Sequence, residues 1–225
     1  MENGNKTAII VGATGLVGSE LLKYLLNSCT YEKVKVLTRR SISISHPKLE
    51  QIIVNFDKLP DYIDIFSTND VYCCLGTTIK TAGSKEAFRK VDYQYALETA
   101  TLAREKGAER FMIVTAMGAD KHSTMFYNQV KGEVEEAVKA LHYPSLHIFR
   151  PSLLLGARKE FRFGEKVAIL LSPILSVIMI GKLKKYKPIQ AKDVAHAMFK
   201  IGQQPIVGEY IYESDKIFSI SKETN

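Results

Sequence analysis

Near the start of the chain stands AIIVGATGLVG (residues 8–18), its most informative segment. A short apolar run reaches three glycines, and an apolar stretch without a helix breaker follows from Leu16 to Leu26. This order predicts a strand, a tight turn and a helix. Such a unit binds a dinucleotide, because its glycines allow the turn and a close approach to the pyrophosphate, and the N–H groups at the helix start face the phosphates. The predicted cofactor-binding residues here are Gly12, Ala13, Thr14, Gly15, Leu16, Val17 and Gly18.

Strand-like and helix-like patterns alternate along the whole chain. We expect strands at 6–12, 33–38, 51–55, 70–75, 110–115, 145–150 and 208–213, and helices at 16–27, 58–66, 84–106, 123–141 and 191–202. This alternation predicts an α/β fold of the Rossmann type, a doubly wound parallel sheet. We expect a single NAD(P)-binding domain over 1–225, with 151–190 as a small C-terminal extension on the substrate side.

Composition narrows the partners and the compartment. The net charge is +7, but the basic residues are scattered and no nucleic-acid motif occurs, so we expect no nucleic-acid partner. The polar start MENGNK has no signal-peptide pattern, and the three cysteines lack framework spacing, which together predict a cytoplasmic protein. The five histidines are dispersed, so we expect no metal site.

One apolar segment, 167–180, precedes a basic run at 182–187. It is shorter than the roughly 20 residues that span a bilayer, and Pro173 interrupts it. We therefore expect no transmembrane segment and favour a core or lid helix with a solvated tail over contact with a membrane or partner.

The choice of cofactor depends on the tip of the second predicted strand. An acid there binds the 2′-hydroxyl of NAD, whereas an arginine accepts the 2′-phosphate of NADP. The chain has Arg39 and Arg40 at this tip and no acid, so we predict NADP(H) over the alternative of two ordinary surface arginines. We also expect Asp57 to reach the adenine edge, and the end of the fourth strand to pass close to the cofactor at Leu75, Gly76 and Thr77.

The catalytic candidates come from the pattern Tyr-x-x-x-Lys, which occurs three times. Tyr31/Lys35 leads into a strand and Tyr212/Lys216 lies at the polar C-terminal end. Tyr127/Lys131 alone falls on a helix after the fifth strand, near the sheet edge where ligands bind. Residues four apart share one helix face, so both side chains can face the nicotinamide ribose.

The chemistry requires this pairing. A free tyrosine has a pKa of about 10, and a nearby ammonium favours the phenolate. Tyr127 is predicted to protonate a carbonyl oxygen as hydride arrives, with Lys131 tuning it. For the hydroxyl that orients the carbonyl we choose Thr115, with Ser123 and Thr124 as alternatives; all three also suit a turn or helix cap.

Further motifs follow in order along the chain: Gly12-x-x-Gly15-x-x-Gly18, Cys74-Leu-Gly-Thr-Thr78, Val91-Asp92, Gly118-Ala-Asp120, Phe126-Tyr127-x-x-Val-Lys-Gly-Glu-Val-Glu135, Phe149-Arg-Pro151, Leu155-Gly156 and Pro188-Ile189. With them the chain resembles the atypical short-chain dehydrogenase/reductases, and more closely the HIV Tat-interactive protein (HTATIP-type) oxidoreductase family and its bacterial relatives.

The resemblance implies an NADPH-binding Rossmann fold with Tyr127 as proton acceptor beside Lys131. It also implies that Arg39 and Arg40 hold the 2′-phosphate and that Arg150-Pro151 begins the wall near the nicotinamide. Two positions depart from related enzymes. Thr115 stands where the family often has serine, and Asp92 where many dehydrogenases carry asparagine.

Three functions remain to be distinguished. The first is an NADPH-dependent reductase of a small, modestly apolar carbonyl compound. The second is a cofactor-loaded sensor or partner-binding protein with little turnover. The third is a nucleotide-sugar epimerase or dehydratase, which ranks last because the segment after Arg150 is short. The helices at 84–106 and 123–141 offer a face for a homodimer, although their apolar stripes must first cover the sheet.

Overall fold

The computed structural model describes residues 6–156 and 181–223. Within them, seven parallel strands form one sheet in the order β3-β2-β1-β4-β5-β6-β9. The strands are β1 (Lys6–Val11), β2 (Tyr31–Thr38), β3 (Leu49–Ile53), β4 (Asp70–Cys73), β5 (Arg110–Val114), β6 (Ser145–Arg150) and β9 (Gly208–Glu213). A separate parallel pair joins β7 (Leu154–Leu155) to β8 (Ile189–Gln190). The predicted doubly wound α/β fold is confirmed.

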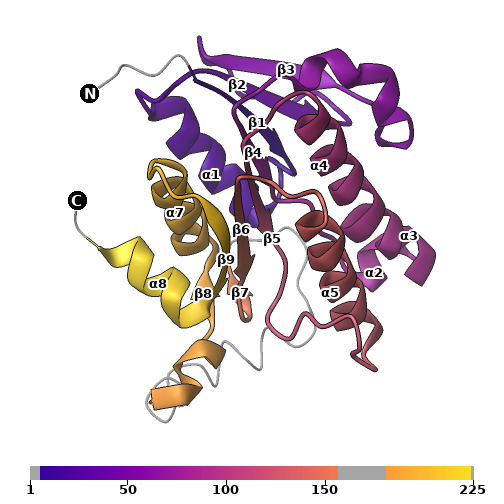
Figure 1. Cartoon of the computed structure of the whole chain (residues 1–225), viewed down its shortest axis with the longest axis vertical. Coiled ribbons are helices and arrows are strands. Elements are labelled where there is room, and N and C mark those ends of the chain that lie inside the picture. The colour runs from indigo at the N-terminus through magenta and orange to yellow at the C-terminus, as the bar shows by residue number, and fades with distance from the viewer. Residues whose placement is uncertain (1–5, 157–180, 224–225) are drawn as a thin grey trace.

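Helices cover both faces of the sheet (Figure 1). One face packs against α1 (Leu16–Asn27), α7 (Ala191–Gly202) and α8 (Ser214–Lys222), and the other against α4 (Tyr95–Glu105) and α5 (Phe126–Lys139). The strands are therefore buried on both sides, which explains their continuous Ile- and Val-rich sequences.

Two predicted helices have a different internal structure. The helix expected at 84–106 is a continuous rod built from α3 (Lys85–Arg89), a π-helical turn η2 (Lys90–Gln94) and α4. The helix expected at 58–66 is η1 (Phe56–Phe66), a 3₁₀ segment that contains Pro60 and is capped by the side chain of Asn55. Proline removes a backbone donor, which favours the shorter 3₁₀ turns over an α-helix.

Three further elements lie outside the sequence-based expectations. They are the short helix α2 (Ile79–Ala82), the C-terminal helix α8 and the 3₁₀ turn η3 (Gly181–Tyr186), which overlaps the basic run at 182–187. Ile217 and Ile220 anchor α8 in the core. The apolar segment 167–180 lies outside the described residues, as does most of the predicted substrate-side extension.

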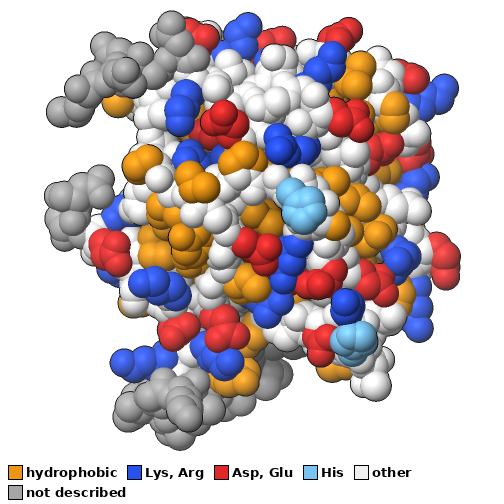
Figure 2. All heavy atoms as spheres, in the orientation of Figure 1, with side chains coloured by type: hydrophobic (Ala, Val, Ile, Leu, Met, Phe, Trp, Pro, Cys, Tyr) orange, Lys and Arg blue, Asp and Glu red, His pale blue; other side chains and the backbone are white. Residues whose placement is uncertain are grey.

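The surface drawn in Figure 2 carries charges of both signs, interspersed rather than gathered by sign. This arrangement is that of an ordinary solvated surface. Over residues 6–156 and 181–223, no helix combines the length and the apolar character needed to cross a bilayer.

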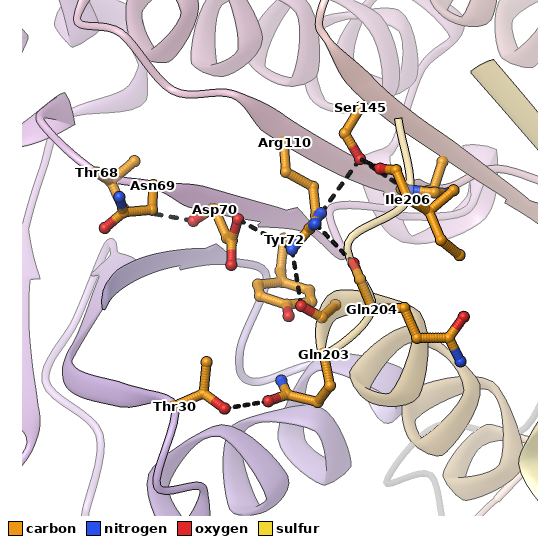
Figure 3. Close-up of polar contacts among 12 residues, drawn as sticks. Thr30, Thr68, Asn69, Asp70, Tyr72, Arg110, Ser145, Gln203, Gln204 and Ile206 are labelled. Carbon is orange, nitrogen blue, oxygen red and sulfur yellow. Dashed lines mark hydrogen bonds and ion pairs between the residues drawn. The ribbon is translucent and has the colours of Figure 1, made fainter. Parts of the chain in front are cut away.

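A buried polar network closes the amino-terminal edge of the sheet (Figure 3). The Arg110 guanidinium donates to the carbonyl oxygens of Gly202 at 2.7 Å and Gln204 at 2.8 Å, and to the hydroxyl of Ser145 at 3.2 Å. It also faces Asp70 at 3.4 Å. Arg110 thereby fastens the end of α7 to β4, β5 and β6, at the edge opposite the candidate site.

Candidate functional site

A cavity of about 130 Å³ lies at the carboxyl edge of the sheet. The chain winds outward from β1 to β3 and resumes on the other side at β4, so this edge holds the topological switch point where such folds bind ligands. The lining comes from the loops after β1, β4, β5 and β6 and from η2 and α5: Gly15, Leu16, Val17, Cys74, Leu75, Gly76, Thr77, Asp92, Val114, Thr115, Ala116, Tyr127, Lys131, Pro151, Ser152, Leu153 and Leu154.

The glycine loop is built for close backbone approach. Gly12 has a φ of +79°, and a Cβ there would collide with the carbonyl oxygen of Cys74. A Cβ on Gly18 would collide with Gly12 itself, which explains how α1 packs against the end of β1. Gly15 is the N-cap residue of α1 and makes no side-chain hydrogen bond, and the first turn of α1 contains no acidic residue. This helix terminus fits a pyrophosphate, because its N–H groups and dipole favour an anion.

Asp92 anchors the loop after β4. The Thr77 N–H donates to Asp92 Oδ2 at 2.9 Å, and a Cβ on Gly76 would lie 3.7 Å from Asp92 Oδ1 and 3.9 Å from Lys131 Nζ. Asp92 sits in the π-helical turn η2, a distortion that often marks functional sites. The loop and the ion-paired side chains therefore form one continuous wall of the cavity.

Tyr127 and Lys131 lie on one face of α5 and both line the cavity. The Tyr127 ring packs against Phe88, with centroids 5.4 Å apart. Lys131 Nζ lies 2.7 Å from Asp92 Oδ1, and the two side chains are 4% and 0% exposed. Burial alone would lower the pKa of Lys131, but the attraction of Asp92 and Tyr127 outweighs it and raises that pKa. The ammonium is therefore a permanent charge beneath the cavity.

Thr115 also lines the cavity, but its hydroxyl is already engaged. It donates to Glu135 Oε1 at 2.6 Å, and Glu135 is buried on α5, one turn beyond Lys131. Arg150 donates to both carboxylate oxygens of Glu135: its Nε lies 3.0 Å from Oε1 and 3.1 Å from Oε2, and a terminal guanidinium nitrogen also donates to Oε2. Arg150 thus binds a carboxylate behind the wall, while its neighbour Pro151 faces the cavity.

Of the predicted residues outside the cavity lining, Gly12, Ala13, Thr14 and Gly18 belong to the adjoining glycine loop and the start of α1, and Arg150 adjoins Pro151, whereas Arg39, Arg40 and Asp57 belong to other parts of the structure. Arg39 and Arg40 are exposed beyond the tip of β2, and neither pairs with a carboxylate among the described residues. Asp57 lines a separate groove of about 870 Å³ between η1 and α4, where it binds Lys90 at 2.7 Å and the hydroxyl of Tyr95. The predicted contact between Asp57 and an adenine stays a prediction.

The sequence reasoning missed several residues of the site. Ser152, Leu153 and Leu154 extend the wall that begins at Pro151. Glu135 has a visible signal, because Tyr127, Lys131 and Glu135 recur every four residues and so share one helix face. Lys131 was predicted, but its pairing with Asp92 had no such signal, because the two residues lie 39 positions apart in the chain. No cluster of three or more potential metal ligands occurs within the described ranges.

Comparisons with known proteins agree with this geometry. Residues 12–151 match a family model described as NAD(P)H-binding. The rat protein HTATIP2 is 41% identical over 168 residues, covering 73% of this chain and 69% of its own. The FMP52 protein of Debaryomyces hansenii, named mitochondrial, is 36% identical and covers 89% of each chain.

Solved structures share the fold. The Bordetella bronchiseptica enzyme WbmH in complex with NAD⁺ has a TM-score of 0.71 at 14% identity, covering 94% of this chain and 76% of its own. A UDP-N-acetylglucosamine 4-epimerase from Methanobrevibacter ruminantium has a TM-score of 0.69 at 13% identity, with coverages of 93% and 77%. At such low identity these likenesses concern the fold alone.

The comparisons correct one expectation. A cytoplasmic protein was predicted from the polar N-terminus and the unpatterned cysteines, and this prediction is wrong. Several yeast relatives carry the word mitochondrial in their names. They are 29–36% identical, and each match covers 89–97% of this chain. Cysteine spacing reports only on redox conditions, and reducing conditions do not single out one compartment.

Proposed function

Because this chain belongs to the NAD(P)H-binding family, and within it to the HTATIP2-type atypical short-chain dehydrogenase/reductases, we propose that it is an NADP(H)-dependent oxidoreductase that reduces a small carbonyl compound. One observation carries the proposal. The glycine loop, the β4 loop and the Tyr127–Lys131 pair, from distant parts of the sequence, line a single cavity at the switch point of the sheet.

The cofactor would be held by backbone at one end and by cations at the other. The start of α1 would receive the pyrophosphate, and Arg39 and Arg40 would pair with the 2′-phosphate that distinguishes NADP from NAD. The β4 loop, from Leu75 to Thr77, lets backbone pass beside the nicotinamide half, and Pro151 forms the facing wall. Bound NADPH would supply the hydride for the carbonyl carbon.

The proton comes from the protein. Tyr127 donates its phenolic proton to the carbonyl oxygen as negative charge develops there, and takes a proton from the alcohol in the reverse direction. Lys131 stabilises the phenolate that remains and binds the ribose. The apolar side chains of Leu153 and Leu154 line the substrate side, which suits a small, modestly apolar compound.

The hydrogen bond from the Thr115 hydroxyl to Glu135 favours a second candidate function. The proposed role of Thr115 is to donate a hydrogen bond to the substrate carbonyl, but a hydroxyl has one proton and this one is given to Glu135. The hydroxyl must leave Glu135 before it can serve the substrate. If it stays, the protein binds NADP(H) as a sensor or partner-binding module with little turnover.

The test begins with binding. Purified protein is titrated with NADPH and NADH while nicotinamide fluorescence is followed, and we expect NADPH to bind at least about tenfold more tightly, or about 1.4 kcal/mol. A screen of small aldehydes and ketones then compares the wild type with Tyr127→Phe, which should abolish NADPH oxidation. Equal binding of both cofactors would contradict the arginine assignment, and unchanged turnover in Tyr127→Phe would contradict the role of Tyr127. Tight binding with no turnover would favour the sensor.

A further inference from the structure

A buried ion pair between Asp92 and Lys131 lines the cavity. The proposed roles of Tyr127 and Lys131 do not by themselves require the carboxylate of Asp92. Asp92 Oδ1 contacts Lys131 Nζ at 2.7 Å, and Asp92 Oδ2 accepts the Thr77 N–H at 2.9 Å. Burying a carboxylate and an ammonium costs several kcal/mol of desolvation for each ion. The close contact between the two ions has to offset this cost. What the negative charge of Asp92 does for the site is therefore a separate question.

The surroundings of Lys131 single out Asp92 as its counter-ion. On α5, Tyr127 lies one turn before Lys131, and Glu135, one turn after it, is taken up by Arg150 and Thr115. From β4, Cys73 faces the pair, and burial raises the pKa of its thiol to about 11, so this group is neutral at physiological pH. Within the described parts of the chain, Asp92 is therefore the one carboxylate paired with Lys131.

Two cations close to Asp92 in the sequence, Arg89 of α3 and Lys90 of η2, form ion pairs with other carboxylates. Arg89 pairs with Glu133 of α5, and Lys90 pairs with Asp57. Both pairs lie outside the cavity lining. Among the described residues that line the cavity, the charged side chains are Lys131 and Asp92.

Opposite charges this close together largely cancel at a third group, because their Coulomb energies with that group differ only through their distances from it. We propose that Asp92 is a positioning residue that sets the proton affinity of Tyr127 by neutralising Lys131, a role that rests on the proposed function of Tyr127 as the proton donor. Asp92 also holds the β4 loop by accepting the Thr77 N–H.

The two roles of Asp92 depend on different properties. An asparagine oxygen would accept the Thr77 N–H as well as a carboxylate does, so anchoring the loop does not need the charge. Neutralising Lys131 does need it. Without the charge, the buried ammonium requires another counter-ion, and the acids that still act on it are the phenol of Tyr127 and, more weakly, the thiol of Cys73. Removing the charge should therefore favour the phenolate.

The experiment is a spectroscopic titration of Asp92→Asn. Phenolate formation by Tyr127 is followed through its ultraviolet absorbance, after subtraction of the same titration of Asp92→Asn/Tyr127→Phe, and the wild type is treated in the same way. We expect the phenolate of Tyr127 to form at a pH lower by about one unit or more, the shift typical of one adjacent charge.

The ten other tyrosines occur in both proteins of each subtraction, so their absorbance cancels. Burial is the main cause that raises the pKa of Tyr31, Tyr72 and Tyr143, and it also raises that of Tyr212 to about 12. These groups ionise above the range of interest and cancel in the difference spectra.

Two controls separate charge from structure. Asp92→Glu restores the carboxylate and should return the titration toward that of the wild type. Glu133→Gln removes a negative charge from α5, the helix of Tyr127, where Glu133 pairs with Arg89 outside the cavity lining, and should leave the Tyr127 titration unchanged. If Asp92→Asn does not fold, Asp92→Ser gives a second neutral variant with room for a water molecule.

An unshifted Tyr127 titration in a folded neutral variant would overturn the proposal, as would an equal shift in Glu133→Gln. A loss of thermal stability without a shift would mean that Asp92 only holds the loop. Since the titration needs neither cofactor nor substrate, its failure is distinguishable from failure of the NADPH binding test.

Discussion

At the scale of single residues, the proposed preference for NADP(H) rests on Arg39 and Arg40. Both are exposed at the tip of β2 and lack carboxylate partners in the described chain, so they can pair with a phosphate at little desolvation cost. We expect Arg39→Ala/Arg40→Ala to weaken NADPH binding by about tenfold or more and to leave NADH binding within about twofold. Lys33→Ala, an exposed cation earlier on β2 that pairs with Glu50, is the matched control in the same fluorescence titration. Equal losses for both cofactors would contradict a phosphate contact.

Thr115 gives a second prediction at this scale. Its hydroxyl donates to the buried Glu135, so Thr115→Val keeps the shape of the side chain and leaves one carboxylate oxygen with fewer donors. We expect a loss of about 1–2 kcal/mol in the free energy of unfolding, measured with denaturant, and no change in NADPH affinity beyond about twofold. Thr115→Ser, which retains the donor, should lose less stability. A wild-type stability in Thr115→Val would show that the bond to Glu135 contributes nothing.

At the scale of elements, the sequence predicts what local pattern controls and misses what contacts control. The strand–turn–helix unit at the glycine loop and the helical face of Tyr127 and Lys131 follow from spacing alone. The π turn at 90–94 does not, because inserting one residue into a turn leaves the apolar pattern on either side nearly unchanged. The environment of Thr115 was missed for a similar reason, since Glu135 lies on another element.

The placement of α5 depends on Gly132, which gives a prediction for the whole helix. A Cβ at Gly132 would collide with the backbone where Asp120 joins Lys121, and would lie 2.6 Å from the Asp120 Cα. A helical Gly→Ala change normally stabilises by about 1 kcal/mol. Here we expect the opposite sign, a loss of about 1–3 kcal/mol, because α5 must move away from the loop. Gln129→Ala, on the same helix without that contact, should change stability by less than about 1 kcal/mol. Denaturant unfolding decides, and a stabilised Gly132→Ala would contradict this packing.

At the scale of the whole molecule, the candidate site and the buried Arg110 network lie at opposite edges of the sheet. The carboxyl edge holds the cavity and its ion pair, and the amino edge holds the Arg110 network that fastens α7 (Figure 3). The sequence could not predict this network, because two of its acceptors are backbone carbonyls at Gly202 and Gln204, which carry no side-chain signature. Substitutions at the amino edge should therefore change stability while leaving the cavity chemistry intact.

His147 makes that edge sensitive to acid. It is fully buried in β6, bonded to Ser145 at 2.9 Å and to the Tyr212 hydroxyl at 3.0 Å, and it stacks on Tyr210. Burial, assisted by Arg110, lowers the pKa of His147 to about 4, below the unfolded value of about 6.5. Between these values the unfolded chain binds the extra proton, so the contribution of His147 is fully present above about pH 6.5 and is lost as the pH falls toward 4.

The predicted loss from this group between about pH 7 and pH 5 is about 1–2 kcal/mol. His147→Gln keeps a donor and an acceptor but does not titrate, so its stability should differ less between the two pH values, whatever its stability at pH 7. The exposed His142, whose φ of +49° suits asparagine, supplies the control His142→Asn, which should retain the wild-type pH dependence. Urea unfolding of the three proteins at both pH values makes the comparison. An identical pH dependence in His147→Gln would mean that protonation of His147 does not drive acid destabilisation.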